Sequence, residues 1–305
     1  MTTTIKPQFP DENEDGEFVR QDDAFRGWVR APEAGRYHLY VSLACPWAHR
    51  TIIMRKLKGL EDAIGMTVVD PIRDEKGWKF TAEPDPVNAF TFLSEAYEKT
   101  DRAYRGRVTV PVLWDKVTSR IVSNSDDDIL RMLETDFDGV AKRNDVDYFP
   151  AQHRAEIASL NAEIYEKINN GVYRAGFATS QKAYEHAAHE VFDALDRLEE
   201  RLSNRRYLFG SAPVETDWRL FVTLVRFDAV YFGHFKCNLR RIVDYPNLWP
   251  YTRDLYQFHG AGETVDLNHI KSHYYYTHDD INPTRIIPIG PIIDWKSPHG
   301  REHLG

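Results

Sequence analysis

The chain has 305 residues, 42% of them hydrophobic and 28% charged, so it is long enough for two globular domains. Its formal net charge of −8 argues against sequence-independent binding to nucleic acid phosphates. No stretch reaches the roughly 20 apolar residues that a membrane-spanning helix needs, so we expect no membrane partner.

The N-terminal residues 1–24 are polar and acidic, and we expect them to form a flexible arm. They contain no secretory apolar stretch. The two cysteines, Cys45 and Cys237, are too few for a disulfide framework. These features predict a protein of a reducing, cytoplasmic compartment.

The next segment predicts a β-α-β unit. Tyr37–Val41 is typical of a strand, and Met66–Val69 is typical of a second strand. Between them lies a predicted helix with Ile53, Met54, Leu57 and Leu60 on one face. After a polar and aromatic insert at about 73–106, short strands are predicted at Val108–Leu113 and Arg120–Val122, followed by a helix. This order is that of a thioredoxin-like domain, which we assign to residues 25–138.

The rest of the chain is predicted to be helical. Residues 139–150 are polar and are expected to be a linker, and residues 151–278 form an all-helical domain. Within it, Trp218–Val230 is apolar on nearly every side, which predicts a buried central helix. Residues 279–305 are expected to be an extended, proline-rich tail. The predicted fold class is therefore an α/β domain followed by an all-α domain.

Cys45 is the strongest candidate for chemistry. It follows a predicted strand and, with Pro46, opens a predicted helix, where free N–H groups and the helix dipole favour the thiolate. The alternative is an inert buried cysteine, because free cysteine is among the most buried residues. Ala48 stands where a dithiol motif has its second cysteine, so the pattern predicts a monothiol site. Cys237 is interpreted as structural.

Other polar clusters admit simpler explanations than metal binding. The acidic run 126–128 complements the dipole of a helix N-terminus, and His269, His273 and His278 lack a supporting carboxylate pattern. We expect no metal. Tyr173 and the tyrosines at 274–276 could pack in a core or line a cleft for an aromatic ligand.

Long motifs resemble the glutathionyl-hydroquinone reductases, also called xi-class glutathione transferases. The resemblance covers residues 25–291 and rests on segments that include SLACPWAHR, VTVPVLWD, INNGVYRAGFAT, RFDAVYFGHFKCN and HIKSHYYYTHDDINPTRIIPIGP. It implies a thioredoxin-like domain, an all-helical glutathione-transferase domain and a homodimer. It also implies a low-molecular-weight thiol as co-substrate, with no covalently bound cofactor, and a thiol conjugate of a hydroquinone as substrate.

The resemblance also assigns roles to residues. Cys45 would attack the sulfur of the conjugate. Val110, before a cis Pro111, would pair with the cysteinyl part of the thiol, and Trp78 would pack against it. Tyr173 and one of Tyr274 and Tyr275 would bind the hydroquinone.

One departure from the family concerns the thiol. Relatives usually carry Glu-Ser at the start of the third helix, where the γ-glutamyl group of glutathione binds, and Ser125 and Asp126 stand there in this chain. A carboxylate at 126 would repel that anion, whereas it could accept hydrogen bonds from the hydroxyls of a sugar-based thiol such as mycothiol. Alternatively, Asp126 points away and glutathione is the thiol.

A second departure from the family concerns a helix cap. Relatives tend to have threonine three residues before the aspartate that opens the central helix, and Val214 stands there before Asp217. One helix-cap hydrogen bond is therefore expected to be lost unless Thr216 replaces it.

Two rival functions stay open. The first rival function is a conjugating transferase, which would activate a bound thiol instead of attacking with its own. The second is a non-catalytic ligand-binding protein on the same fold.

Overall fold

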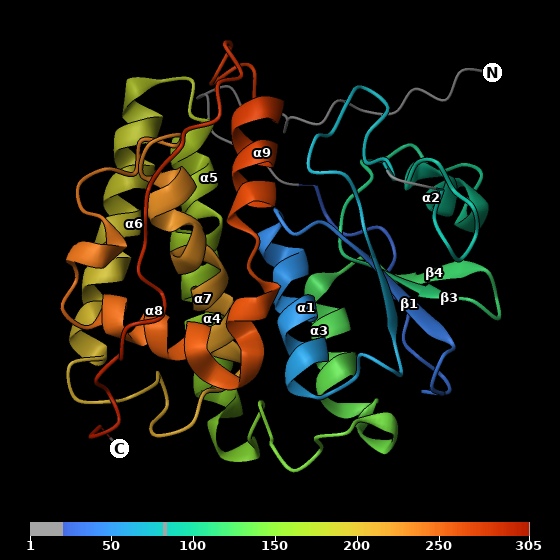
Figure 1. Cartoon of the computed structure of the whole chain (residues 1–305), viewed down its shortest axis with the longest axis horizontal. Coiled ribbons are helices and arrows are strands. Elements are labelled where there is room, and N and C mark those ends of the chain that lie inside the picture. Colours follow the sequence, from blue (N-terminus) through green and yellow to red (C-terminus); the bar gives the residue numbers. More distant parts are fainter. Residues whose placement is uncertain (1–20, 82–83, 305) are drawn as a thin grey trace. The chain divides into compact units, whose positions relative to one another are not determined.

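The computed structural model describes residues 21–81 and 84–304, and they divide into two compact units (Figure 1). Unit 1 comprises the described residues up to 146 together with 268–277, and unit 2 comprises residues 147–267 and 278–304. Most of the expected N-terminal arm, residues 1–20, lies outside the described residues.

Unit 1 is built on a mixed sheet with the strand order β2-β1-β3-β4. β1 (Tyr37–Val41) is parallel to β2 (Gly65–Val68) and antiparallel to β3 (Val112–Asp115), which is antiparallel to β4 (Arg120–Ser123). All residues of β1 and β3 are buried, as expected for the two middle strands of a covered sheet. The topology confirms the predicted thioredoxin-like domain.

Helices cover this sheet on both faces. α1 (Pro46–Leu57) and α3 (Asp126–Thr135) pack against each other on one face, and α2 (Ser94–Thr100) lies on the other (Figure 1). α2 falls within the predicted insert and was missed, because seven residues are too few to show helical periodicity. A 3₁₀ turn, η1 (Asp138–Val140), follows α3.

Two predicted strands are displaced slightly. The strand expected at Val108–Leu113 begins only at Val112, because Pro111 has no N–H to donate to the sheet ladder. β2 ends one residue earlier than predicted, at Val68. The first strand, Tyr37–Val41, agrees with the prediction.

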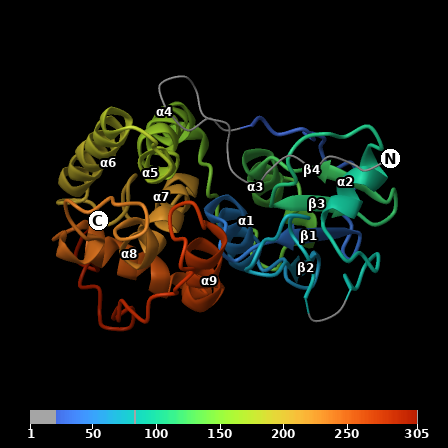
Figure 2. The same ribbon diagram turned by 90° about the horizontal axis from the view of Figure 1, so that it is seen from above.

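Unit 2 is helical, as predicted. Its elements in chain order are η2 (Ala151–His153), α4 (Arg154–Ile164), η3 (Tyr165–Asn169), α5 (Gly171–Gly176), α6 (Gln181–Arg201), α7 (Glu215–Arg226), η4 (Phe227–Tyr231), η5 (Ile242–Asp244), α8 (Leu248–Gln257) and η6 (Phe258–Thr264). Figure 2 shows the other helices around α7, every residue of which is buried. The predicted central helix is therefore confirmed, and it continues into the π-helical turn η4.

The domain boundaries from the sequence stay predictions, and the structure adds one finding to them. α9 (Leu267–Thr277), from the predicted helical domain, groups with unit 1. Two hydrogen bonds join α9 to the rest of unit 1, one between His269 and Ser42 and one between His273 and the carbonyl of Pro71. Helical periodicity reveals that α9 is a helix, but it cannot reveal which partner the helix packs against.

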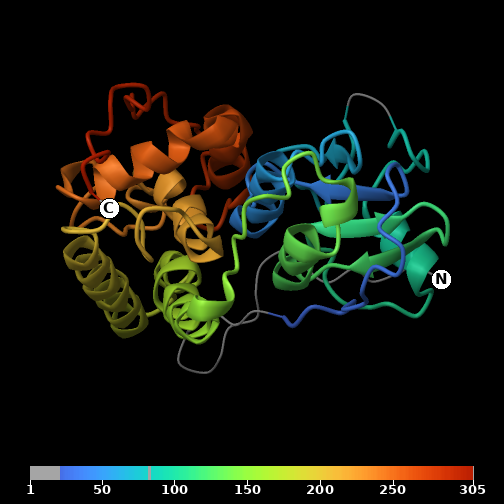
Figure 3. The same ribbon diagram turned by 90° about the horizontal axis from the view of Figure 1, so that it is seen from below.

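The C-terminal tail contains no helix or strand in its described part, residues 278–304 (Figure 3). It is nevertheless anchored to unit 2. The Trp295 ring stacks on Tyr256 at 4.9 Å, and the buried Arg301 guanidinium donates to the Leu202 carbonyl at the end of α6 over 2.8 Å. The Arg301 hydrogen bond satisfies a carbonyl that the C-terminus of α6 leaves without a partner inside the helix.

The start of α7 shows the expected loss of a cap hydrogen bond. Asp217 accepts a hydrogen bond from the Val214 N–H at 2.8 Å, but the valine side chain cannot return one. The Thr216 hydroxyl does not replace it, since it is buried and has no hydrogen-bond partner among the described residues.

Replacing Val214 by threonine should therefore stabilise the protein. Threonine has nearly the shape of valine and adds a side-chain acceptor for the Asp217 N–H, which donates to the Val214 carbonyl at 3.0 Å, so we expect the free energy of unfolding to rise by about 0.5 kcal/mol. Urea denaturation measures this change, with Val214→Ala as the control that removes packing without adding a cap. A threonine variant no more stable than the wild type would contradict the explanation.

Candidate active site

The sulfur of Cys45 lies at the start of α1. Cys45 is the N-cap residue, with φ −74° and ψ 118°, and its Sγ accepts a hydrogen bond from the Ala48 N–H at 3.5 Å. The residue as a whole is only partly buried. An N–H donor and the positive end of a helix both favour negative charge on sulfur, so the helix position predicted for Cys45 is confirmed.

The Val110 carbonyl closes the other side of the sulfur. Sγ lies 3.5 Å from this oxygen, to which the S–H can donate when the thiol is protonated. The Val110–Pro111 peptide bond is cis, as the family resemblance implied. Val110 is buried, and its pairing with a bound thiol stays a prediction.

The N-terminus of α3 holds the two residues that depart from the family. The Ser125 hydroxyl caps the helix by accepting from the Asp128 N–H at 3.3 Å. Asp126 forms a hydrogen-bonded ion pair with Arg50 of α1, and the same guanidinium contacts Asp127 at 2.7 Å. Arg50 is buried, with 2% of its side chain exposed. The Asp126 carboxylate is thus held by a buried cation.

Trp78 lies in the insert that follows β2 and is buried. Its ring stacks on the imidazole of His273 with centroids 5.1 Å apart. The Arg73 guanidinium lies 5.4 Å from the centre of the same ring. The indole is therefore fixed by contacts with α9 and with its own loop.

The tyrosines predicted to bind the hydroquinone belong to different units. Tyr274 and Tyr275 lie on α9 in unit 1; Tyr274 is buried and meets His273 edge-on, and partial burial raises the pKa of Tyr275. Tyr173 lies on α5 in unit 2, where its ring packs edge-on against Phe235 at 5.2 Å. Their roles stay predictions.

The second cysteine, Cys237, has the environment expected of a structural residue. It is fully buried in unit 2, and burial raises the pKa of its thiol to about 12. Neither cysteine forms a disulfide. Among residues 21–81 and 84–304, no group of three or more His, Cys, Asp or Glu side chains is arranged to hold a metal ion.

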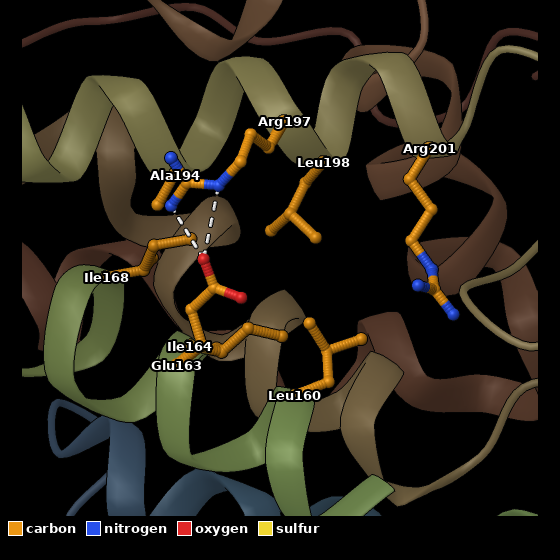
Figure 4. A pocket seen from close by; sticks show the side chains of 8 residues that line it. All are labelled: Leu160, Glu163, Ile164, Ile168, Ala194, Arg197, Leu198 and Arg201. Carbon is orange, nitrogen blue, oxygen red and sulfur yellow. Dashed lines mark hydrogen bonds and ion pairs between the residues drawn. The ribbon is translucent and has the colours of Figure 1, made fainter. Parts of the chain in front are cut away.

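Unit 2 also contains a cavity of about 210 Å³ between α4, η3 and α6 (Figure 4). Its walls are mainly aliphatic, and at its edge Arg197 donates to the Glu163 carboxylate at 2.6 Å. No cysteine, histidine or tyrosine lines it, so it offers no group suited to the thiol chemistry predicted here.

Sequence reasoning missed the contacts that three side chains make near Cys45 and Trp78. Arg50 lies inside an ordinary helical pattern, with no sign that it pairs with acids 76 residues later. His269 and His273 were noticed only as weak metal candidates. Their spacing of four residues places them on one helix face, a signal that could have suggested a shared docking surface.

Comparisons with known proteins show the family to which the chain belongs. The family model described as "Glutathione S-transferase, N-terminal domain" matches residues 44–136, and "Glutathione S-transferase, C-terminal domain" matches residues 181–254. The chain is 50% identical over 283 residues to glutathionyl-hydroquinone reductase PcpF of Sphingobium chlorophenolicum, covering 90% of both chains. It is likewise 50% identical over 305 residues to glutathionyl-hydroquinone reductase YqjG of Escherichia coli, covering 94% of this chain and 93% of the relative.

Solved structures give the same result. The glutathione-bound structure of YqjG from Escherichia coli matches with a TM-score of 0.89 and 51% identity, covering 92% of this chain and 96% of that one. The xi glutathione transferase of Phanerochaete chrysosporium matches with a TM-score of 0.90 and 49% identity, covering 92% and 95%. In the part of the chain that the structure describes, none of the helices is long and apolar enough to cross a membrane.

Proposed function

Because the chain belongs to the glutathionyl-hydroquinone reductases, the xi class of the glutathione transferases, we propose that it cleaves thiol conjugates of hydroquinones through a mixed disulfide on Cys45. The enzyme is a thiol-dependent reductase of the glutathione transferase superfamily. The observation that carries the mechanism is the position of Cys45 Sγ, at the N-cap of α1 and within 3.5 Å of the Ala48 N–H.

The reaction takes two steps. The Cys45 thiolate attacks the sulfur of the conjugate, an S–S bond forms and the bond between that sulfur and the hydroquinone ring breaks. Its electron pair stays on the ring carbon, which takes a proton, so the free hydroquinone leaves. A second thiol molecule then attacks the mixed disulfide, restores Cys45 and carries away the first thiol as a disulfide. The ring carbon is reduced, and the sulfur of the conjugate and the sulfur of the free thiol are oxidised to a disulfide.

The residues around Cys45 suit this scheme better than conjugation. A conjugating transferase activates a bound thiol, whereas here a protein sulfur occupies the start of the helix and accepts its N–H donor. Ala48, one turn into α1, leaves no cysteine for a resolving step within the chain. The external thiol is therefore the reductant.

We assign the hydroquinone to Tyr173 and to one of Tyr274 and Tyr275, as the family resemblance implies. A phenol can donate a hydrogen bond to a hydroquinone oxygen, and its ring can pack against the flat substrate. Trp78 and the backbone of Val110, before Pro111, are assigned to the thiol. Trp78 offers a rigid ring, and the Val110 carbonyl is already adjacent to the reacting sulfur.

For the thiol itself we propose a molecule without a carboxylate at the α3 N-terminus, such as mycothiol. Arg50 contacts both Asp126 and Asp127, so the two carboxylates outnumber the cation that holds them. An added γ-glutamyl carboxylate would meet this net negative charge. Sugar hydroxyls can instead donate to the Asp126 carboxylate, near the helix cap formed by Ser125.

A thiol-selectivity assay tests this assignment. Purified enzyme receives menadione conjugates of glutathione and of mycothiol, each with its matching free thiol, and release of the hydroquinone is followed. We expect kcat/KM to favour the mycothiol pair at least about tenfold, which one unfavourable charge contact can produce.

The matched variant carries Ser125→Glu and Asp126→Ser, which restores the family's Glu-Ser pattern. It should lose the preference for mycothiol and gain activity with glutathione. A wild-type enzyme that prefers glutathione, with the double variant unchanged, would contradict the role of Asp126. Release from neither conjugate would favour a non-catalytic ligand-binding protein.

We also propose that the enzyme is a homodimer and works in a reducing, cytoplasmic compartment. The family resemblance supports the dimer, and the two free cysteines suit a reducing setting. Light scattering coupled to size-exclusion chromatography measures the mass of the particle. A particle with the mass of one 35.5 kDa chain would refute the dimer.

A further inference from the structure

Two histidines of α9 contact the two loops that carry the proposed thiol chemistry. His269 and His273 are four residues apart and therefore lie on one face of the helix. His269 Nε2 lies 3.3 Å from the Ser42 hydroxyl, and His273 Nδ1 lies 2.8 Å from the Pro71 carbonyl oxygen. Figures 1 and 2 show α9 next to α1, which begins at the reactive cysteine.

Ser42 organises the turn that leads into Cys45. Its carbonyl accepts the Cys45 N–H at 3.2 Å, and its hydroxyl accepts the Ala44 N–H at 3.2 Å. Both Ser42 and Ala44 are fully buried. The orientation of the Ser42 side chain therefore determines the position of Cys45 at the end of this turn. His269 contacts the Ser42 side chain directly.

His273 holds the other loop. A carbonyl oxygen only accepts, so Nδ1 of His273 carries the proton and donates to Pro71. The same imidazole stacks on Trp78 at 5.1 Å with the ring planes 25° apart. One side chain thus fixes both the start of the loop that follows β2 and the indole further along it.

We propose that His269 and His273 are positioning residues. His269 holds the Cys45 sulfur in place through its contact with Ser42, and His273 holds the Trp78 ring in the position that contacts the thiol. This inference rests on the proposed roles of Cys45 and Trp78. It predicts separate effects, because the two contacts reach different loops. Loss of the His269 contact should slow the chemical step, and loss of the His273 contact should weaken binding of the thiol.

The test uses a replacement that removes each contact and one that retains it. His269→Leu removes the contact with Ser42, and His269→Gln keeps an amide near the place of Nε2. His273→Leu removes the contact with Pro71, and His273→Asn keeps an N–H near the place of Nδ1. For each variant, kcat, KM for the free thiol and the rate of Cys45 alkylation by iodoacetamide are measured. Cys237 is fully buried, and Cys45→Ala serves as the blank for alkylation.

We expect His269→Leu to lower kcat and the alkylation rate about tenfold, with KM for the thiol changed less than about twofold, since small misplacements of a reacting group cost this much. His269→Gln should recover most of the loss. His273→Leu should raise KM for the thiol about fivefold or more and leave the alkylation rate unchanged, and His273→Asn should lie between it and the wild type.

A His269→Leu variant that fails to fold is replaced by Ser42→Ala, which removes the same contact from the other side together with the acceptor of the Ala44 N–H. The double variant Ser42→Ala, His269→Gln should then have nearly the same kcat as Ser42→Ala alone, because the contact is already lost in the single variant. His269→Leu or Ser42→Ala with kcat and alkylation within about twofold of wild type would overturn the proposal, as would equal effects of both histidines on kcat and KM. Full activity of Cys45→Ala would instead refute the proposed function.

Discussion

Replacing Cys45 by alanine is expected to lower hydroquinone release at least about 1000-fold, because it removes the nucleophile on which both steps depend. The Ala48 N–H that now faces Sγ would be left to solvent or to the bound thiol. The side chain is only partly buried, so the thermal midpoint should change little. Initial rates with the preferred conjugate measure the loss.

Cys237→Ala is the matched control. This cysteine is fully buried, and burial raises the pKa of its thiol to about 12, so it carries no thiolate at neutral pH. Its replacement should leave kcat within about twofold, whatever it costs in stability. Cys45→Ala with full activity, or Cys237→Ala with none, would be incompatible with a Cys45 nucleophile.

Replacing Asp217 by alanine is expected to destabilise unit 2 by about 3 to 4 kcal/mol, because three buried donors lose their acceptor. The carboxylate accepts from the Leu208 N–H at 3.0 Å, the Val214 N–H at 2.8 Å and the Tyr251 hydroxyl at 2.8 Å. It joins the start of α7 to the preceding loop and to α8. Urea denaturation followed by tryptophan fluorescence reports the change, since Trp218 is the next residue.

The loss of stability caused by Asp217→Ala should be larger at low pH than at neutral pH. Burial raises the pKa of Asp217 from 3.8 to about 6. Between these values the folded protein keeps a proton that the unfolded chain has released, so the stabilisation from Asp217 declines as pH rises through this window. Asp217→Ala should therefore cost about 1 to 2 kcal/mol more at pH 4.5 than at pH 7.

Tyr251→Phe provides a milder variant in case Asp217→Ala does not fold. It removes only one of the three donors and should cost about 1 kcal/mol. Asp217→Ala within about 1 kcal/mol of wild type at both pH values would show that this carboxylate does not organise the start of α7.

Local sequence patterns were sufficient for much of the fold and for the position of Cys45. The run Tyr37–Val41 is β-branched and aromatic, and Cys45-Pro46 follows it at a helix start, so strand, turn and N-cap could all be predicted. The apolar run that begins at Trp218 similarly predicted the buried helix α7. In each case the signal lies within a dozen neighbouring residues.

Contacts between distant segments could not be predicted in the same way. Nothing near Arg50 in the chain indicates that it binds Asp126 and Asp127. This pairing shows that Asp126, which stands where the family resemblance implies serine, is held by a buried cation at the N-terminus of α3. Likewise, the contact between His269 and Ser42 spans 227 residues. Such pairs depend on how helices pack, which periodicity within one helix does not encode.

The most direct test of the Cys45 mechanism is intact-mass spectrometry of a single turnover without free thiol. Enzyme is mixed with one equivalent of the hydroquinone conjugate, and both protein mass and released hydroquinone are followed. We expect one hydroquinone per chain and a protein heavier by one thiol less two hydrogens, with peptide mapping to Cys45 and reversal by added thiol. Hydroquinone release with no change in protein mass, or an adduct at Cys237, would contradict the mechanism.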